Sequence, residues 1–253
     1  MQRKNKKFDA ALPIDFVVLW VDGNDPEWQR EHRKYSPARE TYALDNSVVR
    51  YRDWDNMQYW FRAVETFAPW VRTVHFVTWG HLPDFLDPNA PKLHIVNHRD
   101  FIQEECLPLF NSTAIEVNIH KIPGLAEQFV FFNDDMFLTA PVSPEDFFRH
   151  GLPCDTLTEV PIPAVGEKSA FCHHVLNDIG AVNRNFQKRK QLKKHPFCYI
   201  NWRYGVRNLQ NLMLLVYPYY ASFRTQHLAE PYLKSSSLIL THGKLSRLTR
   251  QTP

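Results

Sequence analysis

Residues 16–21 form a continuous apolar run, FVVLWV, with two adjacent valines and no polar interruption. This composition is typical of a strand that is covered on both faces. The run ends at Asp-Gly-Asn-Asp, residues 22–25, which also has the composition of a turn. Such a strand predicts a parallel sheet between layers of helices, with polar side chains at its carboxyl end.

Three further segments have the pattern of buried strands, namely residues 71–80, 92–98 and 128–134. Between the predicted strands at residues 16–21 and 71–80, residues 55–70 repeat apolar side chains at helical spacing, which predicts a helix with one core-facing stripe. Strands that alternate with helices indicate an α/β fold with a largely parallel sheet.

Capping residues mark the ends of the predicted helices. Asp55 is placed to cap the first helix, and Pro69 ends it. A second helix is expected over residues 112–122, where Glu116 would complete a capping box with Thr113.

Beyond residue 150 the pattern is less regular. Helices are predicted near residues 173–186 and 202–216, on either side of a basic run at residues 187–194. We therefore divide the chain into an α/β core, residues 14–148, and an irregular, basic, partly helical part of the same domain, residues 149–253.

The net charge of +3 hides a strong asymmetry. Residues 179–253 hold 13 Lys and Arg side chains against one acidic residue, Glu230. This predicts an anionic partner such as a phosphate or an anionic membrane surface, or else only a solvated basic face. No nucleic-acid recognition motif accompanies the charge, so we expect no nucleic-acid partner.

The four cysteines are far apart and none has Cys-x-x-Cys spacing. This argues against a zinc site or a disulfide framework and fits a reducing compartment. The basic N-terminus precedes no apolar signal core, and the longest apolar run, residues 212–221, is too short to span a bilayer. We expect a cytoplasmic protein, at most peripheral on the inner face of the cell membrane.

Asn133, Asp134 and Asp135 follow directly on the apolar segment FVFF. Two adjacent carboxylates at a strand end offer hard oxygen ligands, which suit Mg²⁺ or Mn²⁺ that bridges substrate phosphates. The alternative is a turn that only ends the strand, since Asn and Asp favour turns. Apolar neighbours on both sides make the pair costly to desolvate unless a cation or hydrogen-bond donors compensate.

Asp22 and Asp25 have the same ambiguity. They lie where a buried strand has just ended, but they also fit a loop that starts a helix at Pro26. Ligands of parallel sheets bind beyond the carboxyl ends of the strands. We therefore expect both aspartate pairs at one edge of the sheet.

Two histidines and one glutamate complete the candidates. Glu116 and His120 lie four residues apart and would share a helix face, although Glu116 also fits a purely structural cap. His227 lies in the basic region, where it would serve as a proton-transfer group or a nucleophile, or have no chemical role.

Three ordered segments resemble the Stealth family, which includes bacterial capsular polysaccharide phosphotransferases and the animal N-acetylglucosamine-phosphotransferase. The first is IDFVVLWVDGNDPEW, residues 14–28. The second begins at VRYRDWDNMQYW, includes LPLFNSTAIEVNIHKIPGLAEQFVFFNDDMFL and ends at PEDFF, residue 148. The third is QHLAEPYLKS, residues 226–235.

The resemblance implies transfer of a sugar-1-phosphate from a nucleotide-diphosphate sugar to a hydroxyl of a polysaccharide acceptor, in capsular or exopolysaccharide synthesis. It implies a Rossmann-like, GT-A-type core that binds the nucleotide sugar. From the basic C-terminal part we expect, at most, peripheral contact with the inner membrane or a capsule assembly. Two alternatives stay open: a glycosyltransferase that releases a nucleoside diphosphate, and an inactive copy that only binds a membrane or a partner.

Carried over to this sequence, the resemblance implies that Asp22 and Asp25 lie beside the reacting phosphate. Asp134 and Asp135 would bind Mg²⁺ or Mn²⁺, and His227 would act as a base or a transient nucleophile. The residues assigned to donor or acceptor binding are Arg52, Glu116, His120 and Asn133. Nothing after residue 235 resembles the family's fourth segment, so we expect a truncated chain.

Overall fold

The computed structural model describes residues 12–35, 54–162, 170–224 and 227–236. The chain divides into two compact units, one of residues 1–154 with 228–253 and the other of residues 155–227. Among the described residues, no helix is long and apolar enough to cross a bilayer.

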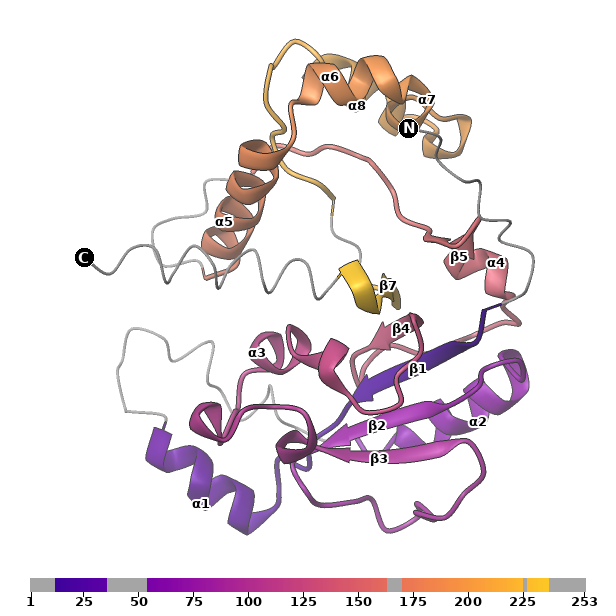
Figure 1. Ribbon diagram of the computed structural model, residues 1–253, viewed down its shortest axis with the longest axis vertical. Coiled ribbons are helices and arrows are strands. Elements are labelled where there is room, and N and C mark those ends of the chain that lie inside the picture. The colour runs from indigo at the N-terminus through magenta and orange to yellow at the C-terminus, as the bar shows by residue number, and fades with distance from the viewer. Residues whose placement is uncertain (1–11, 36–53, 163–169, 225–226, 237–253) are drawn as a thin grey trace, which may run out of the picture. The chain divides into compact units, whose positions relative to one another are not determined.

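The first unit is built on a five-stranded sheet with the order β3-β2-β1-β4-β7 (Figure 1). Four strands are parallel to their neighbours: β1 (Ile14–Leu19), β2 (Val74–Thr78), β3 (Leu93–Asn97) and β4 (Gln128–Phe132). The fifth, β7 (Glu230–Leu233), pairs with β4 in the antiparallel direction. The four predicted strands and the mostly parallel sheet are confirmed, whereas β7 was not predicted.

Helices connect these strands. They are α1 (Pro26–Tyr35), α2 (Met57–Phe67), α3 (Ser112–Glu116) and α4 (Pro144–Phe147), with short 3-10 helices η3 (His98–Asp100), η4 (Glu104–Cys106) and η5 (Ile119–Lys121). Two very short strands, β5 (Phe148–Arg149) and β6 (Leu152–Pro153), form a separate ladder.

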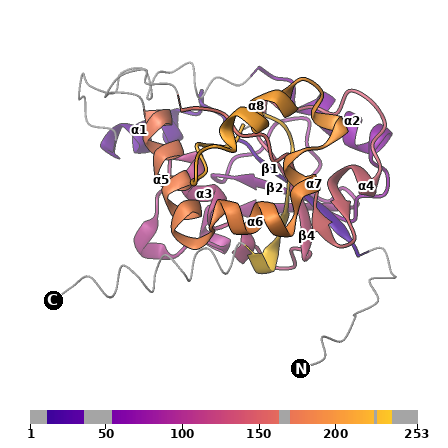
Figure 2. The same cartoon turned by 90° about the horizontal axis from the view of Figure 1, so that it is seen from above.

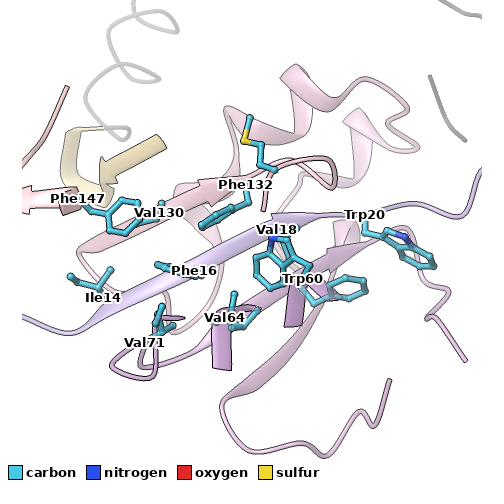
Figure 3. Close-up of a cluster of buried hydrophobic side chains, with 14 of the residues drawn as sticks. Ile14, Phe16, Val18, Trp20, Trp60, Val64, Val71, Val130, Phe132 and Phe147 are labelled. Carbon is cyan, nitrogen blue, oxygen red and sulfur yellow. The ribbon is translucent and has the colours of Figure 1, made fainter. Parts of the chain in front are cut away.

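The core lies on both faces of the sheet, which explains why β1 has no polar alternation. All six β1 residues are buried. Phe16 and Val18 pack with Trp60 of α2 on one face (Figure 3), while Val17 packs with Ile119 on the other. Burial of each such side chain contributes about 1.5–3 kcal/mol.

A buried aspartate fixes the amino end of the sheet. Asp15, in β1, is fully buried, and its carboxylate accepts hydrogen bonds from Arg72 and from the backbone N–H of Ala126 at 2.7 Å. Its Oδ2 also lies 3.0 Å from Nε2 of His75, whose Nδ1 is 2.9 Å from Nδ1 of His94. Burial raises the pKa of Asp15, but the hydrogen bonds from His75, Arg72 and Ala126 outweigh it, so the pKa lies below its ordinary value.

The predicted cap of α2 is wrong. The N-cap residue is Asn56, whose side chain makes no capping hydrogen bond. Asp55 has a φ of 54°, in the left-handed region, and lies one residue before the cap position. Its backbone conformation therefore does not fit the β-region geometry of a capping residue.

The helix predicted over residues 112–122 begins at Ser112 as predicted, but its predicted length is wrong, because α3 ends at Glu116. Asn118 donates from its side chain to the carbonyl of Ala114 at 2.9 Å, while its backbone N–H bonds to Ile115. The side chain thus uses the carbonyl that a continuing α-helix would need. The chain then tightens into η5, and the cap of α3 is Asn111, not Thr113.

The second unit contains α5 (Ala170–Asn185), α6 (Lys188–Lys194), α7 (Pro196–Tyr199), η6 (Trp202–Tyr204) and α8 (Arg207–Leu214), drawn in orange in Figure 2. Lys188 is buried and lies 2.7 Å from the carboxylate of Glu159. Its ammonium group also donates to the carbonyl of Leu214 at 2.7 Å, which ties α6 to the end of α8.

Candidate functional site

The sheet brings the two aspartate pairs to one edge, as predicted. β1 and β4 are parallel neighbours, with Val18 opposite Phe132. The turn at Asp22 and the turn at Asn133 therefore both follow the carboxyl ends of adjacent strands. Asp134 is half-buried and the neighbouring Asp135 is exposed.

Asp25 caps helix α1. Its Oδ1 accepts hydrogen bonds from the backbone N–H groups of Glu27 at 2.7 Å and Trp28 at 2.9 Å. The bond from Trp28 is the main cause of a pKa below the ordinary value for this carboxyl. The helix start at Pro26 is thus confirmed, while a role for Asp22 and Asp25 in the reaction stays a prediction.

His81 joins the turns that follow β1 and β2. Its Nε2 accepts a hydrogen bond from the backbone N–H of Asp22 at 2.8 Å, so this nitrogen carries no proton. The proton of the neutral ring is therefore on Nδ1, which lies 3.2 Å from Oδ2 of Asp25. With its proton on Nδ1, His81 thus contacts both the backbone of Asp22 and the carboxylate of Asp25.

The turn that carries His81 is itself fixed by β3. The side chain of Asn97 donates to the carbonyl of Trp79 at 3.1 Å, and Thr78 donates from its hydroxyl to the carbonyl of His81 at 2.6 Å. Gly80 has a φ of 140°, and a Cβ there would lie 3.1 Å from the Asn97 side chain. Glycine is therefore required between the strand and the histidine.

His98 follows β3 at the same edge of the sheet and is buried, with 7% of its surface exposed. In the described part of the chain, its Nδ1 has no hydrogen-bond partner. Burial, and secondarily the nearby His81, lower the pKa of His98 to about 4. The ring is therefore neutral at neutral pH.

Sequence reasoning missed both histidines. A signal for His81 was present, since Trp-Gly-His directly follows a buried strand. Its contacts to the turn after β1 depend on which strands are neighbours, and the local sequence does not determine which strands pair.

Glu116 contacts Tyr232 of β7. The hydroxyl of Tyr232 donates to Glu230 and lies 3.3 Å from Oε1 of Glu116. One hydroxyl proton thus serves two carboxylates. Burial, and then the charge of Glu230, raise the pKa of Glu116.

The other predicted site residues are His120, His227 and Arg52. His120 is buried in η5, beyond the end of α3, so it does not share a helix face with Glu116. His227 is exposed and lies at the end of the second unit, before Leu228. Arg52 lies outside the described residues.

Asp134 and Asp135 fit a cation that is shared with a substrate. Their carboxylates are the hard oxygen ligands that Mg²⁺ and Mn²⁺ prefer. No group of three or more His, Cys, Asp or Glu side chains able to hold a metal occurs within the ranges that the structure describes.

Comparison with known families and proteins gives consistent matches. Stealth protein conserved region 1 matches residues 12–40, and conserved region 2 matches residues 50–154. The chain is 43% identical over 227 residues to an exopolysaccharide phosphotransferase, cps2G, of Lactiplantibacillus plantarum, covering 89% of this chain and 65% of that protein. It is 44% identical over 223 residues to a capsular polysaccharide phosphotransferase, WcwK, of Streptococcus pneumoniae, covering 88% of this chain and 67% of that protein.

A third relative is covered more fully. The capsular polysaccharide phosphotransferase CpsJ of Streptococcus thermophilus is 46% identical over 200 residues, which are 78% of this chain and 82% of that protein. The chain spans about two thirds of the length of the first two relatives and most of the third. On these matches, the chain belongs to the Stealth family.

Proposed function

We propose that this protein transfers a sugar-1-phosphate from a nucleotide-diphosphate sugar to a hydroxyl of a polysaccharide acceptor, in capsular or exopolysaccharide synthesis. One observation carries the proposal. The two family regions match the segments that hold Asp22, Asp25, Asp134 and Asp135, and relatives that are 43% and 44% identical to this chain are named exopolysaccharide and capsular polysaccharide phosphotransferases.

In the proposed reaction, the acceptor hydroxyl attacks the phosphorus that bears the sugar. A new oxygen–phosphorus bond forms, and the bond from that phosphorus to the bridging oxygen of the diphosphate breaks. The products are a phosphodiester and a nucleoside monophosphate, and the hydroxyl proton passes to a base. Such transfers depend mainly on positioning and on stabilisation of charge.

The proposed roles of the individual residues are those that the family resemblance implies. Asp22 and Asp25 lie beside the reacting phosphate, and Asp25 acts as a positioning group because its carboxylate already holds α1 and His81. His227 is the proposed base or transient nucleophile. The proposed donor- or acceptor-binding residues are Arg52, Glu116, His120 and Asn133.

Asp134 and Asp135 are the proposed ligands of Mg²⁺ or Mn²⁺. When bound, the cation would neutralise charge on the diphosphate of the donor. The protein's own part is to hold these two carboxylates at the end of β4, next to the Asp22 turn at the end of β1. The GT-A type of this core is likewise a proposal that the family resemblance carries, and the mostly parallel sheet agrees with it.

We also propose peripheral contact with the inner face of the cell membrane. The basic residues of the second unit support it, because anionic lipids attract clustered Lys and Arg side chains.

The purified chain, nucleotide-diphosphate sugars, an oligosaccharide acceptor and Mg²⁺ or Mn²⁺ together test the transfer reaction. We expect a released nucleoside monophosphate and a phosphodiester signal in the phosphorus spectrum of the glycan. A nucleoside diphosphate would instead identify a glycosyltransferase, which breaks the sugar–oxygen bond. Absence of any product, with an active relative as a positive control, would indicate an inactive copy.

A further inference from the structure

Apolar side chains are exposed in helix α8 and directly beside it. Val206, Leu209, Met213 and Val216 are 90%, 65%, 68% and 73% exposed. Leu209 and Met213 lie in α8, four residues apart and so on one side of the helix, whereas Val206 is its N-cap residue and Val216 lies two residues beyond its last residue, Leu214. We call these four residues the α8 stripe.

The face opposite the stripe is the one that packs in the second unit. Leu214 is 9% exposed, and Asn211 is 1% exposed because its side chain bonds to the backbone of Glu159, Leu157 and Tyr199. The helix is thus held by its buried face, and the stripe is not needed to hold it. A row of exposed apolar side chains of this kind marks an interaction surface.

Exposed aromatic residues flank the stripe in sequence. They are Phe197, Trp202, Tyr217 and Tyr219, with exposures of 83%, 84%, 58% and 66%. Trp and Tyr are enriched where a protein meets the boundary between lipid and water, since one part of each ring is apolar and another is polar.

Basic residues accompany these side chains. Arg203 lies over the ring of Trp202, with 5.6 Å from Cζ to the ring centroid, and Arg207 begins α8. The basic residues exposed on α6 are Arg189, Lys190, Lys193 and Lys194. The acidic Glu159 is buried against Lys188 and does not offset this surface charge.

We propose that the α8 stripe and its flanking aromatic and basic residues dock on an anionic lipid bilayer. The apolar stripe would enter the interfacial layer, and the arginines and lysines would contact the headgroups. We infer an anionic bilayer as the partner because the residues that accompany the stripe are basic, and a basic surface attracts anionic lipid. The inference rests on the peripheral contact in the proposed function and names the surface that makes it.

Co-sedimentation of the full chain with lipid vesicles tests the docking. We expect binding to vesicles that contain phosphatidylglycerol, much weaker binding to phosphatidylcholine alone, and a decrease with added salt. Val206→Ser, Leu209→Ser, Met213→Ser and Val216→Ser together should weaken binding by at least about tenfold. Arg203→Gln and Arg207→Gln should each weaken it about fivefold.

A matched control removes apolar side chains of similar exposure from the first unit. Tyr59 and Leu152 are 56% and 62% exposed, and Tyr59→Ser with Leu152→Ser should leave vesicle binding unchanged. Far-ultraviolet circular dichroism shows whether each variant is folded. If the serine variant does not fold, the two arginine variants still test the proposal.

Three outcomes would overturn the proposal: no binding to anionic vesicles at low salt, equal binding by the serine variant, or a dimer that this variant converts to a monomer. The last outcome would assign the stripe to a second copy of the chain. Vesicle binding needs no sugar donor, and sugar-1-phosphate transfer is measured with a soluble acceptor. A failure of the docking proposal can therefore be distinguished from a failure of the proposed transfer reaction.

Discussion

At the amino end of the sheet, Asp15 is fully buried and accepts hydrogen bonds from Arg72, His75 and a backbone N–H. At the carboxyl end, Asp134 is half-buried and Asp135 is exposed, on a turn. Both ends place carboxylates on the central strands β1 and β4 or directly after them. The difference is in burial: Asp15 has no exposed surface, whereas Asp134 is half-buried and Asp135 is exposed.

The histidines at the two ends of the sheet also differ in what they contact. At the amino end, His75 lies between Asp15 and His94 inside the sheet layer. At the carboxyl end, His81 joins two turns that border the aspartates. An aspartate–histidine contact is therefore not by itself a sign of chemistry, and its place along the strands decides how we interpret it.

The largest expected effect is on stability, at the amino end. Asp15→Asn should lower the free energy of unfolding by about 3–5 kcal/mol, because Arg72 and His75 lose a buried ionised partner. Since the pKa of Asp15 is lowered in the folded state, its stabilisation is present above the ordinary pKa of 3.8 and is lost as pH falls through the lower value.

Urea denaturation of Asp15→Asn measures this effect at neutral pH. Asp135→Asn serves as the control and should change the free energy of unfolding by less than about 0.5 kcal/mol, since Asp135 is exposed. Equal losses in both variants would remove the distinction between the two ends of the sheet.

The next effect is on binding, at the carboxyl end. Asp134→Asn should weaken Mg²⁺-dependent binding of a nucleotide-diphosphate sugar by about 100-fold, because a neutral amide is a poor ligand for a hard cation. Isothermal calorimetry with and without Mg²⁺ measures it. Asp84→Asn, an exposed aspartate in the connection between β2 and β3, should bind like the wild type. Unchanged affinity in Asp134→Asn would remove this residue from the cation site.

The sequence was sufficient for the four parallel strands. Every residue of β1, β2 and β4 is buried, which leaves a local signature of mostly apolar residues, whereas in β3 only Val96 is buried. The sequence was also sufficient to place both aspartate pairs at one edge, since that follows from alternating strands and helices. It did not reveal β7, whose EPYL segment contains a proline and a glutamate and pairs with β4 about 100 residues away in the chain.

The errors within the site have physical causes of two kinds. Asn118 competes for a helical carbonyl with its side chain, so Glu116 and His120 are separated although their spacing fits a helix. The contacts of Glu116 with Tyr232 and of His81 with the Asp22 turn are tertiary. Spacing alone does not encode them.

A third prediction concerns pH and His98. Its pKa of about 4 in the folded state lies below the ordinary value of 6.5, so the unfolded chain binds more protons between these values. Stability should therefore fall as pH drops from 6.5 to 4, with about 2 kcal/mol due to this ring. Unfolding free energies of His98→Gln across this range should show a correspondingly shallower loss, whereas His150→Asn, at an exposed histidine, should follow the wild type.

The smallest effect is expected from the link between the two turns. His81→Ala removes the acceptor for the Asp22 N–H and the donor to Asp25, so the Asp22 turn loses its fixed position. We expect kcat/KM for sugar-1-phosphate transfer to fall about tenfold, mostly in kcat, because a displaced aspartate affects the reacting phosphate more than the binding of the donor. The free energy of unfolding should change by about 1 kcal/mol.

Two replacements of His81 test its contact to Asp25 and its contact to Asp22 separately. His81→Asn retains a donor near the position of Nδ1 and should restore the contact to Asp25, whereas His81→Gln reaches toward the Asp22 N–H. If the position of Asp22 governs the rate, the glutamine variant recovers more activity than the asparagine variant. His94→Gln, at the amino end of the sheet, is the matched histidine control and should leave kcat unchanged. A loss in His94→Gln as large as that in His81→Ala would mean that both histidines act only through the stability of the sheet, and the contrast between its two ends would then not extend to catalysis.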